Sequence, residues 1–211
     1  MGKENSNNMF IALEIFAVIF ALLYLFLAMK QNIACWYAAF ISTLIYIIIY
    51  WDVSLYMESL LNFYYLLMAI YGWINWNKKS QIDKNYVISW SYQNHILVIL
   101  LILILTVISG FSLQKTDAVY PYLDSFTTWA SVITTFMVTQ KILSNWIFWI
   151  IINSVAIFLN FDRELYLTVI LLMTYQVMSV YGYYQWQKSY YEYKSQTVSY
   201  THLTLPTTPY V

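Results

Sequence analysis

The stretch Tyr71-Gly72-Trp73-Ile74-Asn75-Trp76 recurs 110 residues later as Tyr181-Gly182-Tyr183-Tyr184-Gln185-Trp186. Glycine occurs only four times in this chain of 211 residues, so two Tyr-Gly pairs in the same register are a specific match. Other residues pair at the same offset: Trp36 with Trp146, Asp52 with Asp162, Leu55-Tyr56 with Leu165-Tyr166, and Lys78 with Lys188. The pattern predicts a chain built from two copies of one unit.

The composition around these repeats points to a lipid bilayer. Hydrophobic residues make up 61% of the chain, aromatic residues 20% and charged residues only 9%, whereas a soluble domain carries about 25% charged residues. This excludes an ordinary soluble enzyme and a disordered chain. Ten basic and ten acidic residues give a formal net charge of zero, so no electrostatic field attracts nucleic acid. A single cysteine, Cys35, excludes an intramolecular disulfide framework.

The fold class predicted from this composition is an all-α integral membrane protein. A helix needs about 20 mostly apolar residues to cross the hydrocarbon core. The hydropathy pattern predicts seven such spans, the first of them an uncleaved helix rather than a signal peptide. They cover residues 10–29, 33–51, 54–76, 95–113, 126–143, 146–161 and 165–187.

Seven spans and the repeat together predict the organisation of the chain. Two three-helix repeats, 10–76 and 126–187, flank one linker helix, 95–113. One linker helix gives both copies the same orientation, which is a parallel 3+1+3 arrangement; transporters bind substrate at such repeat interfaces. The linker is almost unbroken Leu, Ile and Val, so it should face lipid or another subunit. The remaining segments are 1–9, the loops 77–94 and 114–125, and the tail 188–211.

Basic residues predict the orientation in the membrane. Cytoplasmic loops carry an excess of Lys and Arg, which places the N-terminus outside and the C-terminus in the cytoplasm. The cytoplasmic set is Lys30, Lys78, Lys79, Lys84, Lys141, Lys188 and Lys194, against Lys3, Lys115 and Arg163 on the other side. Within the tail, residues 195–211 become rich in Ser and Thr and resemble a translated sequencing adapter. We expect this tail to be non-native from about residue 196, and disordered.

The chemistry available inside the membrane is uncharged. No Asp, Glu, Lys, Arg or His falls at the centre of any span, and Lys141 at an inner helix end can extend its amine to the interface. This disfavours a proton relay or an ion-coupling site. The chain also lacks H-E-x-x-H and G-x-S-x-G motifs and paired carboxylates in the membrane. We therefore predict no enzyme activity, no metal and no cofactor; a seven-helix receptor would not require the duplication.

The span 146–161 offers the clearest candidate site. At about 100° per residue, Trp146, Trp149 and Asn153 share one face, with Asn153 near mid-membrane. Their equivalents in the first copy are Trp36, Ala39 and Thr43, so only one half carries this face. Two interpretations remain open from the residues alone. One is a binding face; the other is an interfacial Trp with an Asn that bonds a neighbouring helix.

Further polar residues at mid-membrane depth complete the candidate set: Asn62, Tyr65, Thr134, Tyr175 and Gln176. Such a lining suits a neutral solute, or an aromatic solute with a delocalised positive charge. A phosphorylated solute would require Arg, Lys or a helix N-terminus. The repeated segments 71–76 and 181–186 have a simpler interpretation, as aromatic belts at the membrane interface.

Taken together, the motifs resemble the PnuC family of bacterial vitamin transporters, over roughly residues 14–188. The resemblance rests on a combination of segments: Lys30-Gln31-Asn32-Ile33, Leu55-Tyr56, Tyr71-Gly72-Trp73, Asp124-Ser125, Lys141 with Asn145-Trp146, Trp149 and Asn153, and Leu165-Tyr166-Leu167-Thr168 with Gly182.

The resemblance implies a homotrimer with an architecture similar to full-length SWEET transporters, in the bacterial cytoplasmic (inner) membrane. It implies facilitated diffusion of nicotinamide riboside, followed by trapping through a cytoplasmic kinase. It also implies that the face of Trp146, Trp149 and Asn153 contacts the substrate. Thiamine and riboflavin carriers share this scaffold, so these vitamins remain alternatives.

Overall fold

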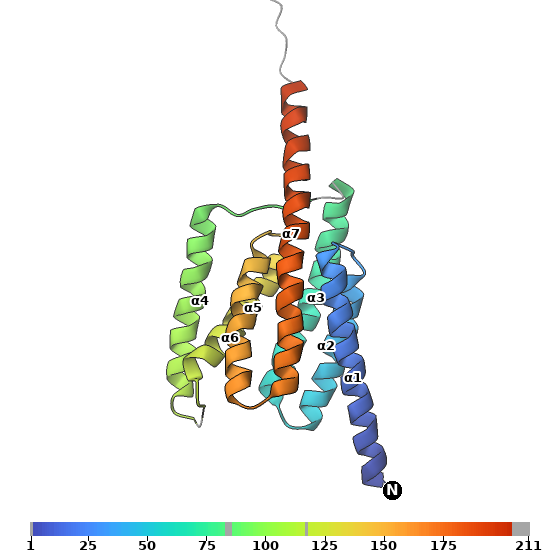
Figure 1. Cartoon of the computed structure of the whole chain (residues 1–211), viewed down its shortest axis with the longest axis vertical. Coiled ribbons are helices and arrows are strands. Elements are labelled where there is room, and N and C mark those ends of the chain that lie inside the picture. Colours follow the sequence, from blue (N-terminus) through green and yellow to red (C-terminus); the bar gives the residue numbers. More distant parts are fainter. Residues whose placement is uncertain (1, 83–85, 117, 204–211) are drawn as a thin grey trace, which may run out of the picture.

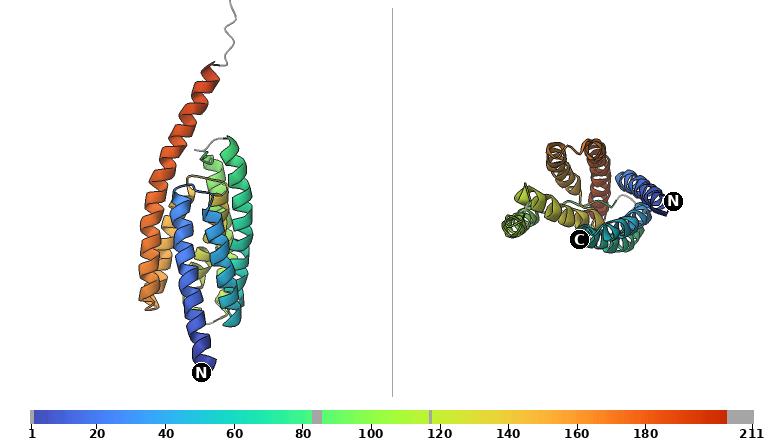
Figure 2. Two further views of the ribbon diagram at one scale, coloured as in Figure 1. Left: turned by 90° about the vertical axis from the view of Figure 1, so that its right-hand side faces the viewer. Right: turned by 90° about the horizontal axis from the view of Figure 1, so that it is seen from below.

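The computed structural model describes residues 2–82, 86–116 and 118–203, and within them the chain forms seven helices (Figure 1). Their bounds are α1 Gly2–Met29, α2 Cys35–Asp52, α3 Tyr56–Ile82, α4 Tyr92–Leu113, α5 Pro121–Thr139, α6 Asn145–Asp162 and α7 Tyr166–Leu203. The all-helical prediction is therefore confirmed. The helices lie roughly along one common axis and alternate in direction. Helix α1 extends beyond the bundle at one end and α7 beyond the other (Figures 1 and 2).

Within the described residues, four helices are long and apolar enough to cross a membrane: residues Met9–Met29 of α1, then α2, α4 and α6. The expected spans 54–76, 126–143 and 165–187 lie on α3, α5 and α7, which are less apolar. The physical reason is their polar content. Helix α5 carries a series of Ser and Thr residues, and α3 and α7 carry polar ends rich in Lys, Gln and Tyr.

Several helices extend beyond the predicted spans; α1, for example, begins at Gly2 rather than at residue 10. Helix α5 begins at Pro121 rather than at residue 126, because proline is favoured in the first turn, where its missing N–H is not needed. Asp124 therefore lies in that first turn, where its carboxylate accepts two hydrogen bonds from Arg163 at 2.7 and 2.8 Å. Helix α7 continues to Leu203, so it includes part of the tail that was expected to be non-native and disordered from about residue 196. The expected disorder of 204–211 lies outside the described residues.

The backbone and its contacts recur at the 110-residue offset. Among the described residues, four non-glycine residues adopt positive φ, and they form two pairs at this offset: Gln31 (54°) with Lys141 (56°), and Ser54 (63°) with Glu164 (60°). Each lies just beyond the end of a helix, where the left-handed conformation closes the last turn. The corresponding turns of the two halves therefore share an uncommon backbone conformation as well as a sequence pattern.

Four buried indoles, Trp36, Trp76, Trp146 and Trp186, meet at one end of the bundle; we call them the tryptophan cluster. Trp36 and Trp76 pack edge to face with ring centroids 5.2 Å apart, and Trp146 and Trp186 do the same at 5.4 Å. Trp76 and Trp186 then contact each other at 5.8 Å. Edge-to-face contacts of this kind add to the stability gained from burial.

Hydrogen bonds cross between the halves in the same paired manner. Trp76 Nε1 donates to the carbonyl of Val138 at 3.1 Å, and Trp186 Nε1 donates to that of Ala28 at 3.0 Å. Val138 and Ala28 are themselves 110 residues apart. The belt interpretation is therefore wrong for Trp76 and Trp186, which are 1% and 0% exposed.

Lys141 lies beside the tryptophan cluster and is 2% exposed, so the expectation that it extends to the interface is wrong. Its Nζ donates to Oε1 of Gln31 at 3.2 Å and lies 4.8 Å from the ring centre of Trp76. Cation–π attraction and this hydrogen bond offset part of the cost of burying the amine. The amine thus joins the turns that follow α1 and α5.

Helix α4 lies at the periphery, packed along α5 (Figures 1 and 2). Large apolar side chains cover its outer surface, including Leu97, Val107, Ile108 and Phe111, which are all more than half exposed. At its start, Ile88 forms a short parallel bridge with Ile142, and His95 bonds Ser144 Oγ at 2.8 Å. The segment before α4 is therefore pinned to the turn between α5 and α6.

Lys79 should give the fold a measurable pH dependence. Its Nζ donates to the carbonyl oxygen of Gln140 at 2.6 Å, and burial lowers its pKa from 10.5 to about 8. Between these two values the unfolded chain binds more protons at Lys79 than the folded chain, so this residue makes stability rise with pH. Thermal unfolding in detergent at pH 7 and 9 should show a rise in Tm that Lys79→Met reduces. Lys78→Met, at an exposed neighbour, is the control; an equal reduction there would contradict the assignment.

Candidate substrate-binding site

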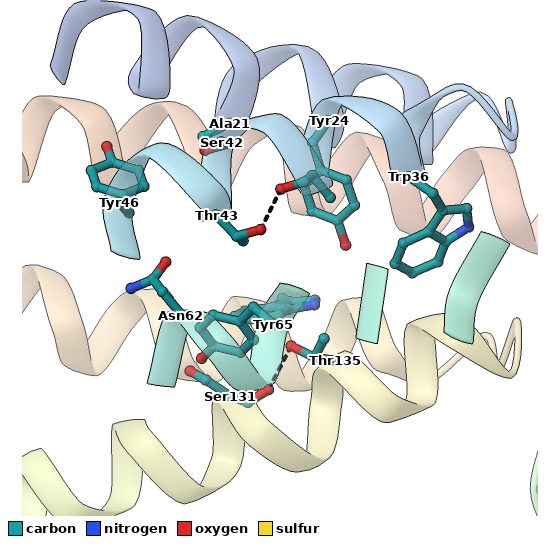
Figure 3. A pocket seen from close by; sticks show the side chains of 12 residues that line it. Ala21, Tyr24, Trp36, Ser42, Thr43, Tyr46, Asn62, Tyr65, Ser131 and Thr135 are labelled. Carbon is teal, nitrogen blue, oxygen red and sulfur yellow. Dashed lines mark hydrogen bonds between the residues drawn. The ribbon is translucent and has the colours of Figure 1, made fainter. Parts of the chain in front are cut away.

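One cavity lies between α1, α2, α3, α5 and α6 and has a volume of about 250 Å³ (Figure 3). The α2 residues line one wall and the α3 and α5 residues line the opposite wall. The lining residues are Ala21, Tyr24, Trp36, Ala39, Ser42, Thr43, Tyr46, Asn62, Tyr65, Ser131, Thr135 and Trp149. We call it cavity A.

A smaller cavity of about 140 Å³, cavity B, adjoins the first and shares Ala21, Tyr24 and Trp149 with it. The two cavities therefore meet beside the Trp149 ring. The remaining residues of cavity B come from α1, α5, α6 and α7: Leu25, Ala28, Val138, Trp146, Asn153, Tyr175 and Ser179.

Hydrogen bonds hold the polar groups of cavity A in place. Asn62 donates from Nδ2 to the Glu58 carbonyl at 2.9 Å, and its side-chain oxygen is turned toward α2 (Figure 3). Thr43 and Thr135 each donate to the carbonyl oxygen four residues earlier, both at 2.8 Å. Because these hydroxyls use their protons on the backbone, their oxygens are left to accept bonds from a solute.

Cavity B has one polar pair of its own. Asn153 Nδ2 lies 3.4 Å from Ser179 Oγ, and Ser179 donates in turn to the Tyr175 carbonyl at 2.8 Å. Asn153 is 5% exposed. Its amide is therefore held by a neighbouring helix, as the simpler interpretation expected, and it also lines a cavity.

The structure brings six of the eight predicted residues to the two cavities. Asn62 and Tyr65 line cavity A, Trp149 lines both, and Trp146, Asn153 and Tyr175 line cavity B. Thr134 and Gln176 line neither. Thr134 is fully buried with no hydrogen-bond partner for its hydroxyl, and Gln176 Nε2 lies 3.4 Å from Ser154 Oγ.

The difference at Thr134 follows from helix geometry. Ser131 and Thr135 are four residues apart and share a face of α5, whereas Thr134 is rotated by about 100° from Thr135. The sequence alone could not tell these adjacent hydroxyls apart, because packing sets the rotation of a helix in an apolar environment.

Several lining residues were absent from the prediction. Trp36 could have been found from its pairing with Trp146 at the repeat offset. Tyr24 and Tyr46 had no such signal, because tyrosine is frequent throughout this chain. Ser179 pairs with Ala69, so its role in cavity B could not be found by symmetry.

Both cavities are uncharged: among the described residues, none of those lining them is Asp, Glu, Lys, Arg or His. Glu14 and Glu58 are exposed on α1 and α3. In the same part of the chain there is no group of three or more His, Cys, Asp or Glu side chains that could hold a metal ion. The cavities therefore offer aromatic faces, hydroxyls and amides to a solute.

Residues 11–188 match the family model described as the nicotinamide mononucleotide transporter family. The chain belongs to this family. Among its relatives is the nicotinamide riboside transporter PnuC of Escherichia coli (strain K12), 24% identical over 173 residues, which cover 69% of this chain and 72% of that protein. The protein of the same name from Shigella flexneri matches equally well.

The fold is that of a solved family structure. The structure titled "Crystal structure of the Vitamin B3 transporter PnuC" matches with a TM-score of 0.67 and 20% identity, over 84% of this chain and 81% of that one. The predicted resemblance to the PnuC family is confirmed, and so is the prediction of a transporter rather than an enzyme. Family membership and the apolar helices together make the chain a multi-pass membrane protein.

Proposed function

We propose that this transporter carries nicotinamide riboside into the cytoplasm by facilitated diffusion. The observation that carries the proposal is cavity A, an uncharged chamber of about 250 Å³ with Trp and Tyr rings and amide and hydroxyl groups in its wall. The relatives are named as nicotinamide riboside transporters, which agrees with this lining.

The absence of charge supports the riboside over the mononucleotide. A phosphate group needs Arg, Lys or a helix N-terminus for binding, and no basic residue of the described chain lines either cavity. The nearby amine of Lys141 is buried and bonded to Gln31. A phosphorylated solute would therefore lose its hydration without compensation.

The aromatic lining supports a pyridinium ring. The Trp149 ring lines both cavities, and a ring with delocalised positive charge can stack on it by cation–π attraction. The amides of Asn62 and Asn153 can pair with a carboxamide. Thiamine is also an aromatic cation and riboflavin is a flat ring system, so these two vitamins form the second candidate.

Titration of the purified protein separates the candidates. Nicotinamide riboside, its mononucleotide, thiamine and riboflavin are each added while Trp fluorescence or heat is recorded. We expect the riboside to bind at least about tenfold more tightly than the mononucleotide, because a single uncompensated phosphate costs more than 1.4 kcal/mol. Tighter binding of the mononucleotide or of thiamine would overturn the assignment.

Uptake should require no ion gradient. In proteoliposomes whose membrane potential is held at zero, because the riboside carries a positive charge, we expect nicotinamide riboside to equilibrate without accumulating. Imposed proton or sodium gradients should then leave its net flux unchanged, because no charged side chain lines the described cavities. Addition of an internal kinase and ATP should convert equilibration into accumulation. Empty liposomes are the control, and accumulation driven by an ion gradient alone would contradict the uniport mechanism.

We propose the topology that the sequence predicted, with seven crossings in a parallel 3+1+3 arrangement similar to SWEET transporters. The repeats are 10–76 and 126–187, with α4 as the linker. The paired positive-φ turns and the paired Trp hydrogen bonds support this arrangement. We also propose an extracytoplasmic N-terminus, the bacterial inner membrane and a homotrimer, in keeping with the sequence resemblance.

A further inference from the structure

The two cavities correspond to each other through the repeat. At an offset of 110 residues, six of the twelve residues that line cavity A have counterparts in the lining of cavity B, among them Trp36 with Trp146, Ala39 with Trp149, Thr43 with Asn153 and Tyr65 with Tyr175; Trp149 lines cavity A as well. The wall from the opposite repeat maps as well, with Ser131 and Thr135 in cavity A and Ala21 and Leu25 in cavity B. Cavities A and B are therefore related to each other by the repeat, and we call each of them a half-site.

Among these pairs, Ala39 and Trp149 differ most in side-chain volume. Ala39 is a small residue on α2, and its counterpart on α6 is the indole of Trp149. Trp149 lines both cavities, whereas Ala39 lines cavity A alone; cavity A has a volume of about 250 Å³ and cavity B about 140 Å³. The larger half-site thus lies where the side chain at this position is small.

The polar groups follow the same division. Cavity A has Ser131 and Thr135 where cavity B has Ala21 and Leu25, so the hydroxyls are concentrated in the roomier half. Asn62 lines cavity A, and its counterpart Leu172 does not line cavity B. Cavity A therefore has both the larger volume and the larger number of hydrogen-bonding groups.

We propose that the Ala39/Trp149 pair determines which half-site accepts the solute, with Ala39 setting the space for the ring and Trp149 closing the other half. Ala39 is then a specificity-determining residue of cavity A. The inference rests on the proposed function for the identity of the solute, but the position of the open half-site can be tested without any vitamin.

Exchange of the two residues tests the inference directly. Ala39→Trp fills cavity A and should weaken binding of nicotinamide riboside about 100-fold or more, since a filled site excludes the ring. The double variant Ala39→Trp/Trp149→Ala reopens space in cavity B and should regain at least about tenfold of that loss. Leu44→Trp adds an indole to an exposed position of the same helix, 42% accessible, and should leave binding unchanged.

A thiol-labelling experiment makes the test independent of the solute. Thr43 and Asn153 occupy equivalent positions in the two cavities, so cysteines placed there, in a Cys35→Ala background, report the access to each. With Ala39 and Trp149 in place, Thr43→Cys should react several-fold faster with a small methanethiosulfonate reagent than Asn153→Cys. In the exchanged double variant the order should reverse.

The outcomes separate this inference from the proposed function. If labelling does not reverse, the Ala39/Trp149 pair does not select the half-site, whatever the protein transports. If labelling reverses but the native protein binds none of the four vitamins, the inference stands and the proposed function is wrong. A third outcome supports both the inference and the proposed function. In it, the order of labelling reverses in the double variant, riboside binding recovers, and that binding no longer depends on Asn62, as tested by Asn62→Ala.

Discussion

Replacement of Trp149 by alanine is expected to weaken binding of nicotinamide riboside by about 30- to 100-fold, equivalent to about 2–3 kcal/mol. The loss combines cation–π attraction to the pyridinium ring with the apolar contact that a large indole provides. Trp149 is the largest of the side chains that line both cavities, so in the native protein no other indole lines both. Isothermal titration of the purified variant measures the effect directly, and the uptake rate in proteoliposomes should fall with it.

Two variants control for the Trp149 result. Trp149→Phe keeps an aromatic face and should retain most of the affinity. Trp73→Ala removes an indole that is 38% exposed on α3 and lines neither cavity, so its affinity should not change. If Trp149→Ala binds the riboside as tightly as the native protein, the ring does not stack at this position.

Replacement of Gly72 by alanine should be the most destabilising single-methyl change in the tryptophan cluster, costing about 3 kcal/mol or more. A Cβ at Gly72 would lie inside the contact distance of the Trp36 ring, and one at Gly182 would lie 2.7 Å from Trp146. These are ring atoms of buried indoles that pack edge to face against Trp76 and Trp186, so any shift of the rings disturbs those contacts. A lower Tm in detergent for both variants, with Gly72→Ala the lower, is the expected result.

The Gly72 prediction can be tested by rescue. If the cost arises from the contact with Trp36, then Trp36→Leu should make Gly72→Ala tolerable, and the double variant should be more stable than the sum of the single effects predicts. The coupling should be about 1–3 kcal/mol, as for other directly packed pairs. Additive effects would show that the glycine serves something other than ring packing.

Much of this architecture was accessible from the pattern of residues. Low charge and seven long apolar segments predicted an all-helical membrane protein, because a chain with so few charges cannot cover a soluble surface. The recurrence of Tyr71-Gly72 at Tyr181-Gly182 located the duplication. The spacing of Trp146, Trp149 and Asn153 identified one wall of the cavities, because residues three and four apart share a face of a helix.

Other features were not visible in the pattern. Trp76 and Trp186 resemble interfacial aromatics in sequence, since burial in protein and residence at a membrane surface favour the same residue. Lys141 was expected at the interface because a lysine near the end of a membrane helix usually extends its charged amine to water. Its burial depends on Gln31 and Trp76, which reach it from the turn after α1 and from α3. Thr134 and Gln176 were selected as polar residues at mid-membrane depth, but their side chains line neither cavity.

The sequence by itself thus determined the class of the protein, its helices, its recurring residue pattern and the absence of charged residues from the centres of its spans. These properties depend on composition and on contacts within one helix, which neighbouring residues specify. Only the tertiary structure decided how each helix is rotated, and therefore which hydroxyls and rings meet in cavities A and B. The reason is that an apolar helix in an apolar setting presents no polarity difference to orient it, so close packing between distant segments, such as Gly72 against Trp36, makes that choice.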